Sequence, residues 1–274
     1  MLFGIKKKNL SIKLPNKKTS VLLGTIPFLI CIILYFYVAH TRHKKNPQDK
    51  VVPTLSQMKE GIKRAAFEKD RKGQYRLWVD TLVSTRRFVI AVAIIFGGVI
   101  IGLHMGVFPL FEALFLRFVL FFDKIPALAV LPILFIIFGL GEVSKIALMV
   151  IGVLPTITLD TYLRAKRVQR EQLLKGFTLG ASSLEVAYRI VLRQIFPKVL
   201  DTIRLNFKSV WLFLIAGESL AATVGLGYRI FVMRRYIAMD IIIPYVLWIS
   251  ILAFIADYIV QRFIRWRYPW LDHE

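Results

Sequence analysis

The chain has 274 residues, of which 57% are hydrophobic and 13% aromatic, and its mean hydropathy is +0.61. Several apolar runs approach the ~20 residues that a helix needs to cross a bilayer, so an ordinary soluble domain is excluded and an all-α integral membrane protein with about six transmembrane helices is predicted. The formal net charge of +21 would indicate nucleic acid in a soluble protein. Because the basic residues lie mostly between the apolar runs, we expect membrane lipid as their partner and no nucleic acid.

The first 39 residues predict an anchored N-terminus. Residues 1–19 form a basic segment, and residues 20–39 are a continuous apolar run that predicts the first transmembrane helix. A cleaved signal peptide is the alternative, but its apolar region would hold only about 7–15 residues. This run is longer and ends in an aromatic group, so we interpret it as a retained anchor. Cys31, the only cysteine, lies in the run and excludes an intrachain disulfide.

Residues 40–84 are the most polar part of the chain and predict an extracytoplasmic loop. Apolar residues recur there at helical spacing: Leu55, Met58, Ile62, Ala66 and Phe67. This pattern predicts a short amphipathic helix at the membrane surface, with a solvated linker as the alternative.

Residues 85–264 predict a transmembrane core, and residues 265–274 a short tail with interfacial cations and aromatic rings. The expected spans are about 88–107, 125–141, 143–162, 200–222 and 241–264. Gly97, Gly98 and Gly102 would allow a neighbouring helix to approach closely. Pro126 and Pro132 indicate either a helix packed inside the protein or a simple kink.

The distribution of Lys and Arg predicts the orientation. Six spans place the N-terminus, residues 164–198 and the C-terminus on one side, and all three are basic, so that side is predicted to be cytoplasmic. Basic residues at 42–45 and 229–235 fall on the opposite side and oppose this count.

The loop 164–198 predicts a basic helix–turn–helix. Residues 171–178 can form one short helix, and Gly180-Ala181-Ser182 a turn. Ser182 or Ser183 can cap a second helix, with Glu185 in its first turn, and Pro197 is expected to end it. This is more structure than a connection requires, so we interpret the loop as a docking surface for a cytoplasmic partner.

Three passages carry a resemblance to a known family: LLKGFTLGASSLEVAYRIVLRQIFP (173–197), IPALAVLPILFIIFGLGEVSK (125–145) and GESLAATVGLGY (217–228), the last followed by Arg234 and Asp240. Together they resemble the permease subunits of ATP-binding-cassette importers of the nitrate/sulfonate/taurine branch. The order and spacing of the resemblance extend over roughly residues 53–270. The family pattern Glu-Ala-Ala before the turn glycine is replaced here by Leu174-Lys175-Gly176.

The resemblance implies a bacterial inner-membrane, multi-pass protein with both termini in the cytoplasm. Two copies of the chain, or the chain and a relative, would form the path. Cytoplasmic ATP-binding subunits would drive alternating access, and an extracytoplasmic substrate-binding protein would deliver a small anion such as a sulfonate or nitrate, although relatives could carry neutral heterocycles. ATP-Mg would bind the partner ATPase, with no cofactor on this chain.

We expect no catalysis in the chain itself. It contains no G-x-x-x-x-G-K-[ST] sequence, and no His, Cys, Asp or Glu cluster has metal-ligand spacing. A secondary transporter with inverted repeats, or a membrane assembly subunit that transports nothing, are the rival interpretations.

The resemblance implies a set of residues that couple the chain to the ATPase: Glu171, Lys175, Gly180, Ala181, Ser182, Arg189 and Pro197. The basic members, with Arg193, could instead face anionic lipid. Polar residues in or near the spans are candidates for the translocation pathway: Asp160, Asn206, Ser209 and Glu218. The alternative for Glu218 is a structural ion pair with Arg229 or Arg235.

Overall fold

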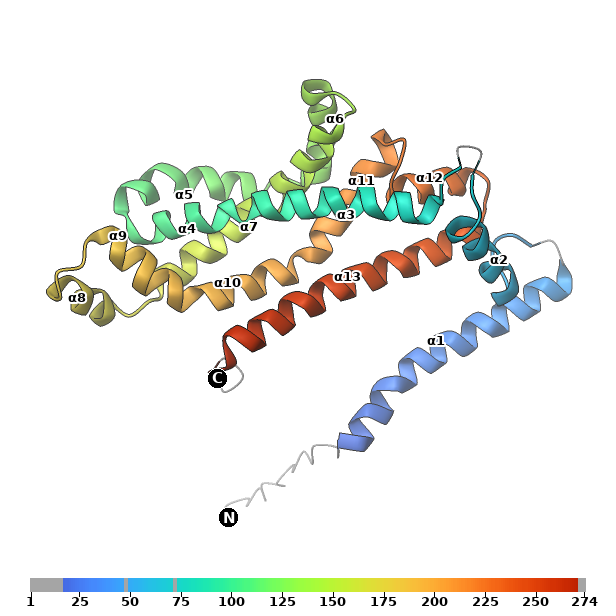
Figure 1. The fold of residues 1–274 in the computed structure, drawn as a ribbon, viewed down its shortest axis with the longest axis horizontal. Coiled ribbons are helices and arrows are strands. Elements are labelled where there is room, and N and C mark those ends of the chain that lie inside the picture. Colours follow the sequence, from blue (N-terminus) through green and yellow to red (C-terminus); the bar gives the residue numbers. More distant parts are fainter. Residues whose placement is uncertain (1–16, 47–48, 71–72, 271–274) are drawn as a thin grey trace, which may run out of the picture.

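The computed structural model describes residues 17–46, 49–70 and 73–270, and in this part of the chain it is helical, with an isolated bridge between Lys69 and Tyr75 but no strand (Figure 1). The helices are α1 (Lys17–Lys45), α2 (Leu55–Ala66), α3 (Arg76–Ile95), α4 (Gly97–Val107), α5 (Pro109–Asp123), α6 (Ala127–Phe138), α7 (Glu142–Lys166), α8 (Arg170–Thr178), α9 (Ser183–Glu185), the π-helix η1 (Val186–Leu192), α10 (Arg193–Leu205), α11 (Phe207–Ala221), α12 (Leu226–Arg235) and α13 (Met239–Arg267). The predicted N-terminal segment 1–19 and the tail 265–274 lie partly outside the described residues.

Four helical segments are long and apolar enough to cross a membrane: 22–45, 76–107, 142–166 and 239–267. Two bent pairs complete the set, namely α5 with α6 at 101° and the segment 183–221 with α12 at 53°. The described residues therefore contain four to six spans, and the prediction of an all-α membrane protein with about six is confirmed. The boundaries differ, since α1 continues to Lys45 and α3 already begins at Arg76.

The region predicted as the span 125–141 holds the short helix α6, which follows α5 after a bend of 101°. Pro126 precedes α6, and its missing N–H cannot continue the hydrogen-bond pattern of α5. α6 has 12 residues, too few to cross ~30 Å of hydrocarbon alone. Only Ala127, Leu131 and Leu134 of α6 are buried, whereas Ile136 is 84% exposed. The bend lies beside Pro126, in line with the kink interpretation, whereas Pro132 lies inside the continuous helix α6.

The core of the molecule lies around α7, which packs against α3, α4, α6 and α11. A methyl group on Gly102 would collide with the Thr158 carbonyl oxygen, and one on Gly98 would lie 2.9 Å from the Thr158 hydroxyl. The expected close approach of a neighbouring helix is thus confirmed for these two glycines. It is wrong for Gly97, because a methyl group there would meet no neighbouring helix within 4 Å.

The helices α1 and α2 connect at the end of the molecule opposite α8 (Figure 1). Most of α1 is exposed, and its Tyr35 hydroxyl donates to the Pro53 carbonyl at 2.7 Å. α2 begins with a capping box between Thr54 and Gln57. A short helix therefore forms here in place of a linker, with Ala65 and Ala66 buried. Leu55, Ile62 and Phe67 of the predicted apolar face are exposed, and its position at the membrane surface stays a prediction.

One expectation about the region 193–222 is wrong. Pro197 does not end a helix, because it is buried inside α10, which continues to Leu205. The apolar face of α10, with Ile195, Val199 and Ile203, packs into the core and keeps the chain helical past the proline. The expected span 200–222 lies almost wholly within the helical segment 183–221, where Asn206 marks only the boundary between α10 and α11.

Candidate functional site

The helix α8 ends in a turn whose N–H groups donate hydrogen bonds to carbonyl groups of its last turn. The N–H of Ala181 donates to the Gly176 carbonyl at 3.1 Å, and the N–H of Gly180 to the Phe177 carbonyl at 3.0 Å. These two bonds form a Schellman motif, which needs a residue in the left-handed conformation just after the helix. Gly180 has φ +85 and supplies it. The predicted turn glycine is confirmed as a helix-ending residue.

The next helix begins at once with a capping box. The Ser182 hydroxyl accepts from the N–H of Glu185 at 3.3 Å, and the Glu185 carboxylate accepts from the N–H of Ser182 at 3.1 Å. Both alternatives for the cap are resolved, since Ser182 is the capping residue and Ser183 the first helical one. The helix–turn–helix predicted from the sequence is therefore present.

The departure from the family pattern at residues 174–176 has a packing consequence. Gly176 is the buried residue of α8, and a methyl group there would lie 2.7 Å from the end of the Ile190 side chain and 3.2 Å from Val186. Glycine thus lets α8 lie close to η1. Leu174 and Lys175 point outward and are exposed.

The outer side of this turn is apolar at its tip. Leu179 is 88% exposed, and exposed apolar side chains surround it: Leu174, Phe177 and Leu184. The same segment carries the exposed charged residues Glu171, in the first turn of α8, Lys175, in its last turn, and Arg189, which pairs with Glu185 at 3.2 Å. We name the surface formed by residues 171–189 the α8–η1 surface. The sequence analysis missed Leu179, although a leucine beside a turn glycine in a polar loop was a visible signal.

The structure does not gather the four pathway candidates into one site. Asp160 pairs with Arg164 on its own helix at 2.6 Å, and the Asn206 amide donates to the Thr202 carbonyl. Ser209 is half-buried near the start of α11. Glu218, at the other end of α11, is fully buried. A pathway role for these residues stays a prediction.

Glu218 lies at the centre of a buried ion network. Its carboxylate accepts from the Ser84 hydroxyl at 2.7 Å, from the Arg87 guanidinium at 2.8 Å and from the N–H of Gly227 at 2.8 Å. A buried carboxylate needs these partners, because burial removes its hydrating water and only hydrogen bonds or an ion pair can replace that stabilisation. The expected pairing of Glu218 with Arg229 or Arg235 is wrong, since its cationic partner is Arg87.

Arg87 joins two of the passages that resemble the family. Its Nε and Nη2 donate to the two oxygens of Glu142, both at 2.6 Å, while Nη1 donates to Glu218. The bidentate geometry fits a guanidinium to a carboxylate. Glu142 stands at the end of the passage 125–145 and Glu218 near the start of the passage 217–228. Both carboxylates thus meet on one arginine of α3.

A third carboxylate, on α3, completes the network. Asp80 is fully buried and accepts from the Arg229 Nε at 2.9 Å, the N–H of Gly225 at 3.0 Å and the Tyr245 hydroxyl at 3.3 Å. The sequence analysis missed Asp80, Ser84 and Arg87. Their spacing of four and three residues, which places polar side chains on one helix face, was the available signal.

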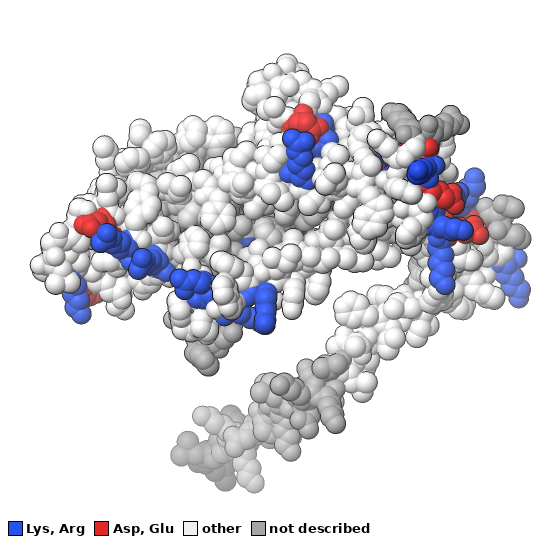
Figure 2. Space-filling view, viewed as in Figure 1, with Lys and Arg blue, Asp and Glu red and all other residues white. Residues whose placement is uncertain are grey.

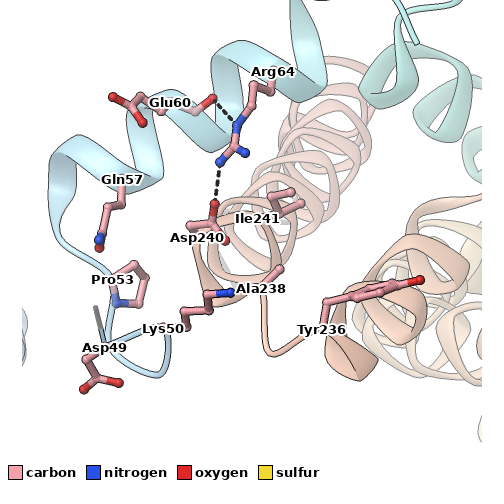
Figure 3. A pocket seen from close by; sticks show the side chains of 10 residues that line it. All are labelled: Asp49, Lys50, Pro53, Gln57, Glu60, Arg64, Tyr236, Ala238, Asp240 and Ile241. Atoms are coloured by element: carbon pink, nitrogen blue, oxygen red, sulfur yellow. Dashed lines mark hydrogen bonds and ion pairs between the residues drawn. The ribbon is translucent and has the colours of Figure 1, made fainter. Parts of the chain in front are cut away.

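A mixed-charge pocket of about 350 Å³ opens at the end of the molecule that carries α2 (Figure 3). Arg64 of α2 donates to Asp240 of α13 at 2.7 Å across one wall, and Lys50 points toward Ala238. The N–H of Val51, together with Arg42, holds the pKa of Asp49 below its ordinary value. In the residues described, no group of three or more His, Cys, Asp or Glu could hold a metal ion.

Comparison with known proteins agrees with this architecture. Residues 94–268 match the family described as "Binding-protein-dependent transport system inner membrane component". The chain is 29% identical over 195 residues to the taurine transport system permease protein TauC of Escherichia coli (strain K12), covering 71% of each chain. It is 26% identical over 275 residues to a putative ABC transporter permease protein of Methanocaldococcus jannaschii, covering 95% of this chain and 97% of the relative.

A third relative is the putative aliphatic sulfonates transport permease protein SsuC of Escherichia coli (strain K12), 26% identical over 147 residues, which cover 54% of this chain and 56% of the relative. Because the family match covers more than half of the chain, the chain belongs to the binding-protein-dependent transport system inner membrane components. It is a multi-pass membrane permease of the ABC importer class, similar to the taurine and sulfonate permeases.

Proposed function

We propose that this permease carries a small organic sulfonate or related anion into the cell by alternating access, driven by separate ATP-hydrolysing subunits that dock on the α8–η1 surface. The observation that carries the docking site is the exposure of Leu179, at 88%, on a turn that is itself held firmly by a Schellman motif and a capping box. Exposed apolar patches rimmed by polar residues are typical of protein interaction sites.

The charges around the tip support a specific partner. Glu171, Lys175 and Arg189 are exposed on the same segment as the apolar residues, and many interfaces have a polar rim around an apolar centre. We assign Leu179 and Phe177 to the centre of the contact and these three charges to its rim. Gly180, Ala181 and Ser182 shape the turn, while the buried Pro197 acts through the packing of α10.

The remaining partners follow from the family. A second permease subunit, most simply a second copy, would complete the path, and an extracytoplasmic binding protein would meet the end that carries the pocket of Figure 3. The α8–η1 surface then lies in the cytoplasm together with both termini, in accordance with the excess of Lys and Arg there. The sulfonate substrate is supported by the names of two relatives alone. ATP-Mg would bind the partner subunits.

Co-purification from detergent tests the docking site. The full chain is expressed with its ATPase subunit, and the amount of ATPase recovered is compared for the wild type, Leu179→Asp and Tyr236→Asp. Tyr236 is 69% exposed at the opposite end of the molecule and serves as the matched control. We expect Leu179→Asp to lose most of the bound ATPase, because a centrally buried interface side chain can contribute about 2 kcal/mol or more.

The control variant should recover the wild-type amount. Equal recovery with Leu179→Asp would contradict docking at this turn. A wild-type chain that brings down no ATPase while it remains monodisperse would contradict the importer mechanism and favour a secondary transporter or an assembly subunit.

A further inference from the structure

Two adjoining cavities lie among the helix ends near α8. One of about 220 Å³ is lined by Arg164 of α7, by Arg167 just after α7, and by Gln194 and Lys198 of α10. The other, of about 290 Å³, is lined by Arg164, Lys198 and Asp201 with Gln261 and Arg265 of α13. Arg164 and Lys198 border both, so the two cavities form one basic cleft between α7, α10 and α13. Four cations and one carboxylate line it.

Arg164 is held in place on one side of the cleft. Arg164 is 29% exposed, donates its Nε to Asp160 at 2.6 Å and its Nη2 to the Thr202 hydroxyl at 3.0 Å. The carboxylate of Asp201 is engaged by Arg204, at 2.8 Å. Arg164 is matched by Asp160 and Asp201 by Arg204, so the exposed Arg167 and Arg265 give the cleft an excess of positive charge. An anion is the complementary ligand.

An exposed apolar stripe on α13 leads directly into the cleft. Leu247, Ile251, Phe254 and Tyr258 follow one another at spacings of four and three residues and are 56%, 47%, 70% and 56% exposed. Gln261 and Arg265 continue the same spacing, so one face of α13 presents the apolar side chains first and then two residues that line the cleft. The Phe254 and Tyr258 rings are stacked, with centroids 6.5 Å apart.

The charge distribution places this cleft at a membrane boundary. Figure 2 shows a band of Lys and Arg along the end of the molecule that carries α8 and η1, reaching the C-terminal end of α13, beside a broad area with almost no charge. Trp266 and Trp270, near the cleft in sequence, are 75% and 57% exposed. Exposed tryptophans next to cations are typical of the interface between lipid headgroups and acyl chains.

We propose that the cleft binds the phosphate of an anionic phospholipid whose acyl chain lies along the stripe of α13. Basic pockets between transmembrane helices are suited to phosphodiester headgroups, and guanidinium groups form strong charge-assisted hydrogen bonds with phosphate oxygens. A lipid explains both features, because it is an amphiphile that satisfies the cations and covers the adjoining apolar stripe. A free phosphate would satisfy only the cleft.

Native mass spectrometry of the full chain in detergent tests this site. The protein is incubated with equal amounts of dioleoyl phosphatidylglycerol and dioleoyl phosphatidylcholine, and the lipids retained are counted. We expect the wild type to retain phosphatidylglycerol preferentially. The double variant Lys198→Gln, Arg265→Gln should bind it about 25-fold more weakly, at ~5-fold for each cation removed.

The matched control is Arg193→Gln with Arg267→Gln, which removes one cation from each of the same two helices but outside the cleft. It should retain the wild-type preference, and size-exclusion chromatography checks that both variants stay folded. The proposal would be overturned if the wild type retained the two lipids equally, or if the control variant lost as much phosphatidylglycerol binding as the cleft variant. Displacement of the lipid by millimolar inorganic phosphate would show a free-anion site and overturn the assignment to lipid.

Discussion

The turn after α8 and the ion network around Glu218 both depend on glycines and carboxylates. The turn joins residues that are close in the sequence, whereas the network joins residues that are far apart in it. In the turn, Ser182 and Glu185 bond across three residues and lie at the surface. In the network, Arg87 and Glu218 are 131 residues apart, and Asp80 and Arg229 are 149 apart, with both carboxylates fully buried. Changes in the turn should therefore affect a partner, whereas changes in the network should affect the fold.

The largest effect is expected for Arg87→Met. This change leaves the fully buried carboxylate of Glu218 without its cation, and breaking a buried ion pair on one side costs about 3–5 kcal/mol. We expect a large fall in the thermal unfolding midpoint in detergent and in the amount of chain in the membrane. Arg86→Met, an exposed neighbour, is the control and should change little. Recovery of stability in the double variant Arg87→Met, Glu218→Leu would confirm that the unpaired charge is the cause. Equal stability of Arg87→Met and the control Arg86→Met would contradict the network.

A smaller effect on the same network is expected for Gly225→Ala. Its φ is +139, and a methyl group would lie 2.6 Å from the Glu218 carboxylate, so strain and the displaced carboxylate should destabilise the fold by about 2–3 kcal/mol. Gly97→Ala is the matched control, because the added methyl group would meet no neighbouring helix within 4 Å. It should be neutral or raise stability by about 0.5–1 kcal/mol. Chemical unfolding of both variants in detergent measures the difference, and similar loss in both would refute the role assigned to Gly225.

The smallest effect on the fold is expected in the turn. Gly180→Ala forces a left-handed conformation on alanine at about 1–2 kcal/mol, and Ser182→Ala removes a helix cap at about 1 kcal/mol. Neither change should lower the global unfolding midpoint as Arg87→Met does. Hydrogen exchange of residues 176–186 should instead rise. Asparagine tolerates the left-handed region, so amide exchange should be slower in Gly180→Asn than in Gly180→Ala. Faster global unfolding of these variants would contradict the view that the turn affects only its own segment.

The sequence by itself predicted the elements that depend on neighbouring residues. The spans follow from runs of apolar residues, and the α8 turn and its cap follow from Gly180 and Ser182, because each bond there joins residues close in the chain. The amphipathic helix α2 is likewise a local pattern. The family was recognised from passages whose order along the chain is visible without coordinates.

Only the tertiary structure decided which charges meet. Glu218 was expected to pair with a nearby arginine, but the packing of α3 against α11 brings Arg87 to it. Pro197 was expected to end a helix, yet the burial of Ile195, Val199 and Ile203 keeps α10 continuous, because the packing of an apolar face outweighs one lost hydrogen bond. Neighbouring residues determine local helix and turn propensity. The partners of a buried charge depend instead on how helices distant in the sequence pack together.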